Sequence, residues 1–185
     1  MKERGSLGFW LYLMTDCMLF ASLFAVFAVL RTATADGPTA NELFELPMVL
    51  GETFILLTSS FTCGVGVLLL RRKQLVPAVS LLIITYLLGI AFLVIELTEF
   101  TSIIDKGFDW GTSAFLSSFF VLVGTHGLHI FIGLLWLLIL IALLVRQGIT
   151  DNLLKKAGLF ALFWHFLDLV WIFIFTFVYL LGVAA

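Results

Sequence analysis

The sequence predicts an all-α integral membrane protein, a bundle of five transmembrane helices. Of its 185 residues, 62% are hydrophobic and 12% are charged. A soluble domain carries about 45–50% apolar and about 25% charged residues, and a chain this short cannot bury such an excess in its own core. Five apolar runs, each longer than the about 20 residues that cross a bilayer, are separated by short polar breaks. No basic cluster suited to nucleic acid is present.

The predicted spans are residues 7–30, 46–70, 76–100, 114–145 and 158–183. Lys2 and Arg4 precede the first run, as in a signal peptide, but its 24 residues exceed the about 7–15 of a signal core, so we expect a retained anchor. Pro47 and Pro77 stand at the starts of the second and third spans, where a missing N–H is harmless.

The fourth run is too long for a perpendicular crossing, and we expect it to tilt. The fifth follows Lys155 and Lys156 and is apolar to near the end of the chain. Because the connections between the runs are short, we expect one membrane domain over residues 1–185.

Basic residues predict the orientation of the bundle. Only Arg31 and Lys106 lie on one side. The other side carries Lys2, Arg4, Arg71, Arg72, Lys73, Arg146, Lys155 and Lys156. Basic loops stay inside, so we expect the N-terminus inside and, with five spans, the C-terminus outside.

Ionisable side chains within the spans are the most informative residues, since such groups are costly in lipid and usually face a bundle interior. They are Asp16, Glu52, Glu96, Glu99, His126, His129, His165 and Asp168. The last six form three pairs spaced three residues apart, which places both members of a pair on one helix face. We therefore expect each pair to point at a neighbouring helix, and a contact between Glu96 and His126 is compatible with their depths.

Several interpretations of these residues remain open. The pattern favours a polar network that fixes the register of the helices; the five acids outnumber the histidines, so we expect some to be protonated. A proton path or a lipid-headgroup role is the second interpretation. Haem ligation by His126 and His165 is a third, and a metal site from His126, His129, Glu96 and Glu99 a fourth, although the Glu-x-x-His pattern of carboxylate-bridged bundles is missing. We expect Cys17 and Cys63, both in apolar runs, to be buried packing residues.

Five segments carry a family resemblance. They are residues 8–16, 44–54, 96–100, 124–133 (GTHGLHIFIG) and 163–171 (FWHFLDLVW). In this order, and over essentially the whole chain, they resemble subunit III of the haem-copper oxidases, the cytochrome c oxidase subunit III family, and are closest to its five-helix quinol-oxidising form.

The resemblance implies a non-catalytic accessory subunit of a proton-pumping quinol:oxygen oxidoreductase in the bacterial inner membrane. Haem and copper would then lie in subunit I, with subunits II and IV as further partners and phospholipid bound to this chain, which would hold no cofactor or metal itself. One alternative is subunit III of a bacterial cytochrome c oxidase. Another is a small transporter or channel subunit, although such a protein would be expected to show internal repeats or broken helices.

The resemblance also suggests roles for single residues. It matches Glu45, before Leu46-Pro47, to a reactive membrane glutamate of the family; alternatively, Glu45 is a helix N-terminal carboxylate favoured by the dipole. The resemblance implies structural roles for the ionisable residues of the last three spans, Glu96, His126, His129, His165 and Asp168. We expect the face that bears the motifs of the fourth and fifth spans to meet subunit I.

Substitution of Asp168 tests the network interpretation. Asn keeps a side-chain oxygen and adds a donor, whereas Leu leaves the polar neighbours without a partner. We expect Asp168→Asn to reduce the yield of the assembled protein far less than Asp168→Leu, measured by quantitative purification from membranes. Equal losses in the two variants would contradict the interpretation.

Overall fold

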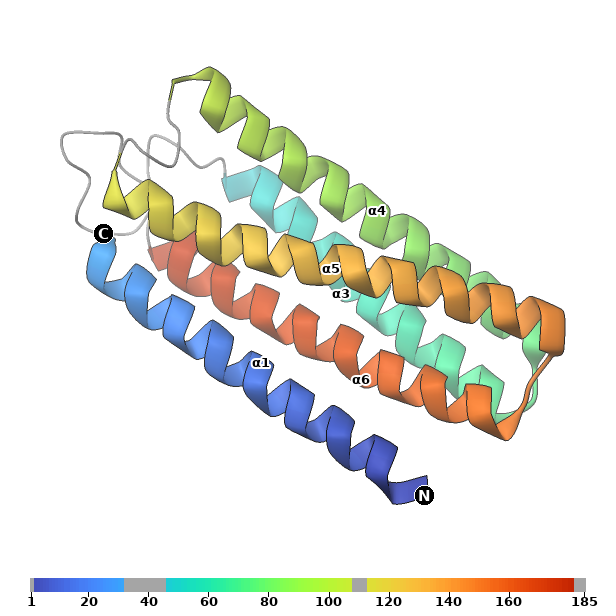
Figure 1. Ribbon diagram of the computed structural model, residues 1–185. Coiled ribbons are helices and arrows are strands. Elements are labelled where there is room, and N and C mark those ends of the chain that lie inside the picture. The colour runs from blue at the N-terminus through green and yellow to red at the C-terminus, as the bar shows by residue number, and fades with distance from the viewer. Residues whose placement is uncertain (1, 32–45, 108–112, 182–185) are drawn as a thin grey trace.

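The computed structural model is a bundle of long helices lying side by side (Figure 1). It describes residues 2–31, 46–107 and 113–181, with side chains described over 7–31, 47–107 and 113–181. The elements are α1 (Lys2–Leu30), α3 (Leu46–Arg71), α4 (Leu75–Asp105), α5 (Ala114–Gln147), α6 (Asp151–Ile174) and the π-helix η1 (Phe175–Leu180). The described part of the chain holds five helices long and apolar enough to cross a membrane. The all-α membrane fold is confirmed.

The last helix begins earlier than predicted, at Asp151 rather than at residue 158. Lys155 and Lys156 therefore lie in the first turns of α6 and not in a loop. Apolar composition marks only the part of a helix that lipid can surround, whereas the helix itself continues until its hydrogen bonding ends. Here Thr150 caps it, because the Leu153 N–H donates to Thr150 Oγ1 at 3.3 Å.

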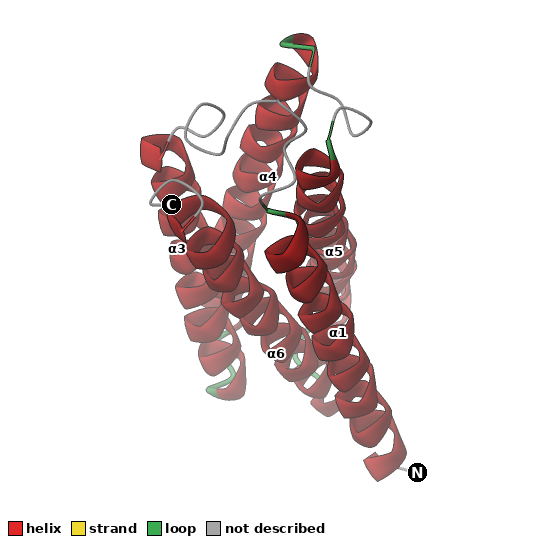
Figure 2. Ribbon diagram, turned by 90° about the vertical axis from the view of Figure 1, so that its left-hand side faces the viewer, coloured by secondary structure: helices red, strands yellow, loops and turns green. Residues whose placement is uncertain are grey.

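Helices α3, α4, α5 and α6 form a four-helix arrangement, and α1 lies along one side of it (Figure 2). Helix α3 packs along α4 and α6, and α5 packs along α4 and α6. Helix α1 packs mainly on α5, with a smaller contact on α6. In this view α6 is seen between α1 and α3 (Figure 2).

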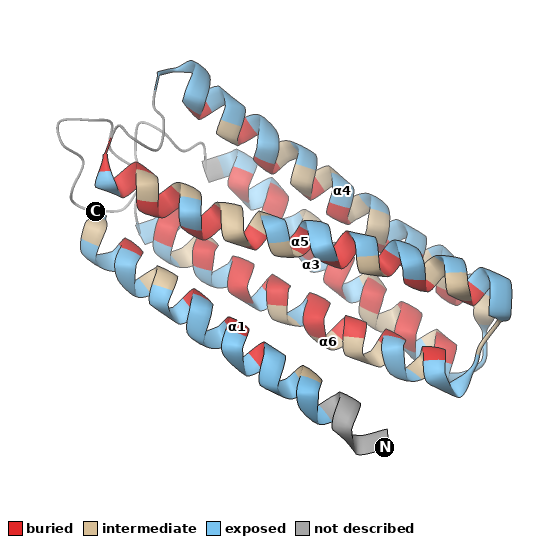
Figure 3. Cartoon of the chain, viewed as in Figure 1, coloured by how far each residue is buried: buried red, intermediate tan, exposed pale blue. Residues whose placement is uncertain are grey.

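Buried side chains line the interior, and exposed ones are largely apolar (Figure 3). Phe61 is 71% exposed and Met18 is 74% exposed, which suits a surface surrounded by lipid. Cys63 is buried as predicted, but the prediction for Cys17 is wrong, because its side chain is exposed on α1. The apolar context of a cysteine does not distinguish a core from a lipid-facing surface.

Trp164 of α6 is held between two glycines of the neighbouring helices. A Cβ at Gly89 of α4 would lie 3.1 Å from the indole and 2.7 Å from Leu134 Cδ2, and one at Gly133 of α5 would lie 2.8 Å from the indole. Trp164 is 1% exposed. These two glycines therefore allow α4 and α5 to pack closely against the indole of Trp164.

Adding a methyl group at Gly133 should disturb this packing. We expect Gly133→Ala to lower the free energy of unfolding by about 1–3 kcal/mol through overpacking. The matched control is Gly127→Ala on the same helix, where a Cβ would meet nothing within 4 Å; it should be neutral or slightly stabilising, since Ala favours helix. Unfolding in detergent, followed by circular dichroism, measures both. Equal stability of the two variants would contradict the packing argument.

Candidate functional site

The described ionisable residues of the spans lie at four places in the bundle. Asp16 meets His129, His126 lies in the centre, Glu52 gathers with Glu96 and Glu99, and His165 lies with Asp168. Glu45 lies outside the described residues.

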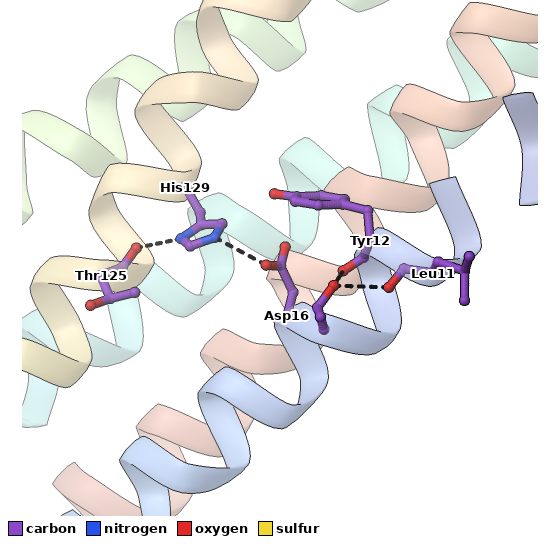
Figure 4. Close-up of polar contacts among 6 residues, drawn as sticks. Leu11, Tyr12, Asp16, Thr125 and His129 are labelled. Carbon is purple, nitrogen blue, oxygen red and sulfur yellow. Dashed lines mark hydrogen bonds and ion pairs between the residues drawn. The ribbon is translucent and has the colours of Figure 1, made fainter. Parts of the chain in front are cut away.

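Asp16 of α1 and His129 of α5 form a polar contact between helices (Figure 4). Asp16 Oδ1 lies 3.6 Å from His129 Nε2, and both side chains are largely buried. On the other side of the ring, His129 Nδ1 lies 2.7 Å from the carbonyl oxygen of Thr125. Phe20 covers the ring, with centroids 5.3 Å apart.

The geometry shows which ring nitrogen of His129 carries a hydrogen. A carbonyl oxygen only accepts, so His129 Nδ1 must carry a hydrogen and donate to Thr125. Nε2 and the carboxyl then face each other across a distance longer than an ordinary hydrogen bond. An attractive contact needs one proton there, on the imidazole or on the carboxyl. Asp16 and His129 thus join α1 to α5 through a polar contact.

His126 lies at the centre of the four-helix arrangement and is 0% exposed. Its ring stacks on Trp171 of α6, with centroids 5.4 Å apart and planes at 28°, and meets the edge of Phe92 of α4 at 6.0 Å. Neither ring nitrogen has a hydrogen-bond partner among the described residues. In this structure His126 therefore packs as an aromatic ring.

Three glutamates gather between α3, α4 and η1. Glu52, Glu96 and Glu99 are buried and close enough for their charges to interact. The Tyr179 hydroxyl donates to Glu99 Oε2 at 3.5 Å. Glu96 has no hydrogen-bond partner among the described residues, so the suggested contact with His126 is not a hydrogen bond.

Two tryptophans of α6 hydrogen-bond to hydroxyl groups of α3. The Trp164 indole N–H donates to Ser59 Oγ at 3.2 Å, and the Trp171 indole N–H donates to Thr53 Oγ1 at 3.1 Å. We did not predict the acceptors. The signal was present, because the two tryptophans are seven residues apart on α6 and the hydroxyls recur in reverse order on the antiparallel α3.

His165 and Asp168 share a face, but only Asp168 is buried. His165 is exposed, while its Nδ1 lies 2.6 Å from Ser60 Oγ of α3. The Asp168 side chain is 9% exposed and lies beside the same serine. The prediction that each pair faces a neighbouring helix thus holds for Asp168 and not fully for His165.

The motif faces of the fourth and fifth spans are mostly internal. His126, Trp164 and Trp171 are at most 1% exposed, so these motif residues form contacts within the bundle, while His165 lies at the surface. The expectation that the face bearing these motifs meets subunit I stays a prediction.

The suggested four-residue metal site is not assembled. His129 turns to Asp16 of α1, and Glu99 accepts from Tyr179. Over the described ranges, no group of three or more His, Cys, Asp or Glu side chains is arranged to hold a metal ion.

The indole–hydroxyl bond of Trp171 can be isolated by a double-mutant cycle. Trp171→Phe removes the donor and leaves a void, and Thr53→Val removes the acceptor. Because the void is present with and without the Thr53 hydroxyl, subtracting the two single effects from that of the double variant leaves the coupling energy of the hydrogen bond. We expect a coupling of about 0.5–1.5 kcal/mol in the free energy of unfolding in detergent. A control cycle pairs Trp171→Phe with Thr58→Val, whose exposed hydroxyl bonds only its own helix. Additive effects in both cycles would show that the bond contributes nothing.

Comparison with known proteins gives one consistent assignment. The family model for cytochrome c oxidase subunit III matches residues 2–183. Cytochrome bo(3) ubiquinol oxidase subunit 3 of Pseudomonas aeruginosa is 53% identical over 175 residues, 95% of this chain and 84% of the relative. Quinol oxidase subunit 3 of Bacillus spizizenii is 49% identical over 178 residues, 96% and 87% of the two chains.

A relative with a different name is nearly as similar. Cytochrome c oxidase subunit 3 of a Bacillus species (strain PS3) is 44% identical over 178 residues, 96% of this chain and 86% of the relative. The matched region contains all the helices that carry the polar contacts described above. With this coverage, and with five apolar helices in the expected order, the chain belongs to the cytochrome c oxidase subunit III family.

Proposed function

We propose that this chain is the accessory third subunit of a proton-pumping haem-copper quinol oxidase in an aerobic respiratory chain. The observation that carries the proposal is the 53% identity, over nearly the whole chain, to a ubiquinol oxidase subunit 3. A quinol oxidase subunit 3 from a second genus is 49% identical. Haem and copper would lie in subunit I, and subunits II and IV would complete the complex.

The contribution of this chain would be structural. Its buried polar side chains connect helices to one another: Asp16 to His129, Trp171 to Thr53, and Trp164 to Ser59. Contacts of this kind, distributed along α1, α3, α5 and α6, give a stiff surface against which subunit I could be held. The exposed apolar side chains around the bundle would also contact phospholipid.

A bacterial inner membrane would hold the complex. The eight basic residues on one side against two on the other support an N-terminus inside and a C-terminus outside. All five helices would then belong to a single membrane domain spanning residues 1–185.

A cytochrome c oxidase is the second candidate for the complex. The relative from strain PS3, named for that activity, is 44% identical over 96% of this chain. Relatives named for the two activities are both similar to this chain over nearly its whole length, so the electron donor has to be determined on the assembled complex.

Affinity purification of the intact complex tests the proposal. A tag on this chain, with extraction in a mild detergent, should recover haem-containing polypeptides together with quinol-dependent oxygen consumption. Oxygen consumption with reduced cytochrome c, and little with quinol, would select the second candidate. The same purification from cells that lack the tag is the control.

One outcome would contradict membership in an oxidase. If the tagged chain is recovered from native membranes by itself, with no haem absorption and no oxygen reduction, the proposal is wrong. Recovery should therefore be compared at several detergent concentrations, since excess detergent strips lipid and subunits from membrane complexes.

A further inference from the structure

An open groove runs along the outer surface of the bundle between α3 and α6. Its volume is about 400 Å³. The wall on α3 consists of Leu57, Ser60, Phe61, Gly64, Val65 and Leu68, and α6 contributes His165 and Asp168. Phe61 at the rim is 71% exposed. The groove is thus apolar except for Ser60, His165 and Asp168.

These three polar side chains leave two acceptor atoms without a partner. His165 Nδ1–H can donate to Ser60 Oγ, 2.6 Å away, while the Ser60 hydroxyl donates to the Asp168 carboxyl, and this tautomer leaves His165 Nε2 without a hydrogen. Asp168 is 9% exposed, and its Oδ1 has no hydrogen-bond partner among the described residues. His165 Nε2 has no hydrogen bond in the described part of the chain either. Both unpaired atoms can accept a hydrogen.

The depth of this site decides what could supply the donor. Helices α6 and η1 form one span from Asp151 to Leu180, and His165 lies near its midpoint. At 1.5 Å per residue, it is about 21 Å along the helix from either end. Phospholipid headgroups lie at the ends of a span, whereas acyl chains at its centre offer no hydrogen bond.

We propose that this groove receives a transmembrane helix of another subunit of the same complex, with a side-chain N–H or O–H donor opposite Asp168. The identity of the complex rests on the function proposed above; the docking itself rests on the groove. A helix from another subunit supplies at mid-membrane the donor that lipid lacks, and the apolar walls fit its remaining surface.

The surroundings of His165 also fit the docking of a helix. His165 also lines a second groove of about 340 Å³ on the other side of α6, with Trp10, Leu13, Met14 and Cys17 of α1. Gly64 lets the imidazole lie close to α3, because a Cβ there would already be 3.5 Å from Nε2. Ser60, His165 and Asp168, the polar floor of the groove, are therefore flanked by apolar side chains of α3 on one side and of α1 on the other. Figure 2 shows α6 between these two helices.

Photo-cross-linking in native membranes tests the docking. Benzoylphenylalanine replaces Phe61 at the groove rim, and in a matched control it replaces Phe131, a 47%-exposed residue of α5 that lines neither groove. Membranes are irradiated before detergent is added, the chain is purified through its tag, and adducts are identified by mass. We expect Phe61 to yield an adduct with a hydrophobic segment of another polypeptide.

Substitution of Asp168 tests the chemistry of the contact. In the Phe61 probe background, Asp168→Leu should reduce the polypeptide adduct several-fold, while Asp168→Asn, which keeps an acceptor oxygen, should retain it. Circular dichroism of the purified chain shows that the variants remain helical. An adduct that is unchanged in Asp168→Leu overturns the role of the polar floor.

The outcomes separate this inference from the proposed function. If an active oxidase co-purifies while Phe61 forms adducts only with phospholipid, or none, the groove is not a helix-docking site and the proposed function stands. If Phe61 cross-links to a polypeptide segment but no haem and no oxygen reduction accompany the chain, the docking surface stands and the proposed function is wrong.

Discussion

The bundle depends on two hydrogen bonds that lipid could not replace. Each indole N–H of α6, at Trp164 and Trp171, meets a hydroxyl of α3, and in the membrane interior a donor without such an acceptor would be costly. Because the two tryptophans are two turns apart on one face, the pair fixes both the rotation of α6 and its position along α3. The glycines on α4 and α5 and the ring of His126 then fit around the same two indoles.

The fold was largely readable from the sequence because the bilayer allows few alternatives. Long apolar runs must be helical in lipid, and Pro47 and Pro77 marked helix starts that the structure confirms. The start of α6 was missed, since Asp151, Lys155 and Lys156 interrupt the apolar run but not the helix. The exposure of Cys17 was missed because lipid-facing and core positions have the same composition.

The sequence identified which polar residues lie within the spans but not which of them contact each other. Spacing placed His126 and His129 on one face correctly, yet it could not show that one stacks on Trp171 while the other meets Asp16. Pairings depend on the relative depth and rotation of two helices, and a single sequence gives neither. The hydroxyl acceptors were missed for a related reason: Ser and Thr in a membrane helix commonly bond their own backbone, as Thr58 does with Phe54.

The π-helical turn of Phe175–Leu180 has a consequence for how this segment could vary. A π-turn holds one residue more than an α-turn, so it shifts the angular position of everything that follows. Seven residues beyond Trp171 stands Val178, and the shift brings its neighbour Tyr179 inward as well, within reach of Glu99. In a regular α-helix Tyr179, eight residues beyond Trp171, would stand about 80° away from the face of Trp171, whereas a seven-residue spacing would keep the phenol on that face. Loss of one residue between Trp171 and Tyr179, together with the π-turn, would therefore keep the contact with Glu99 in phase, while a regular α-helix of the present length would turn the phenol away.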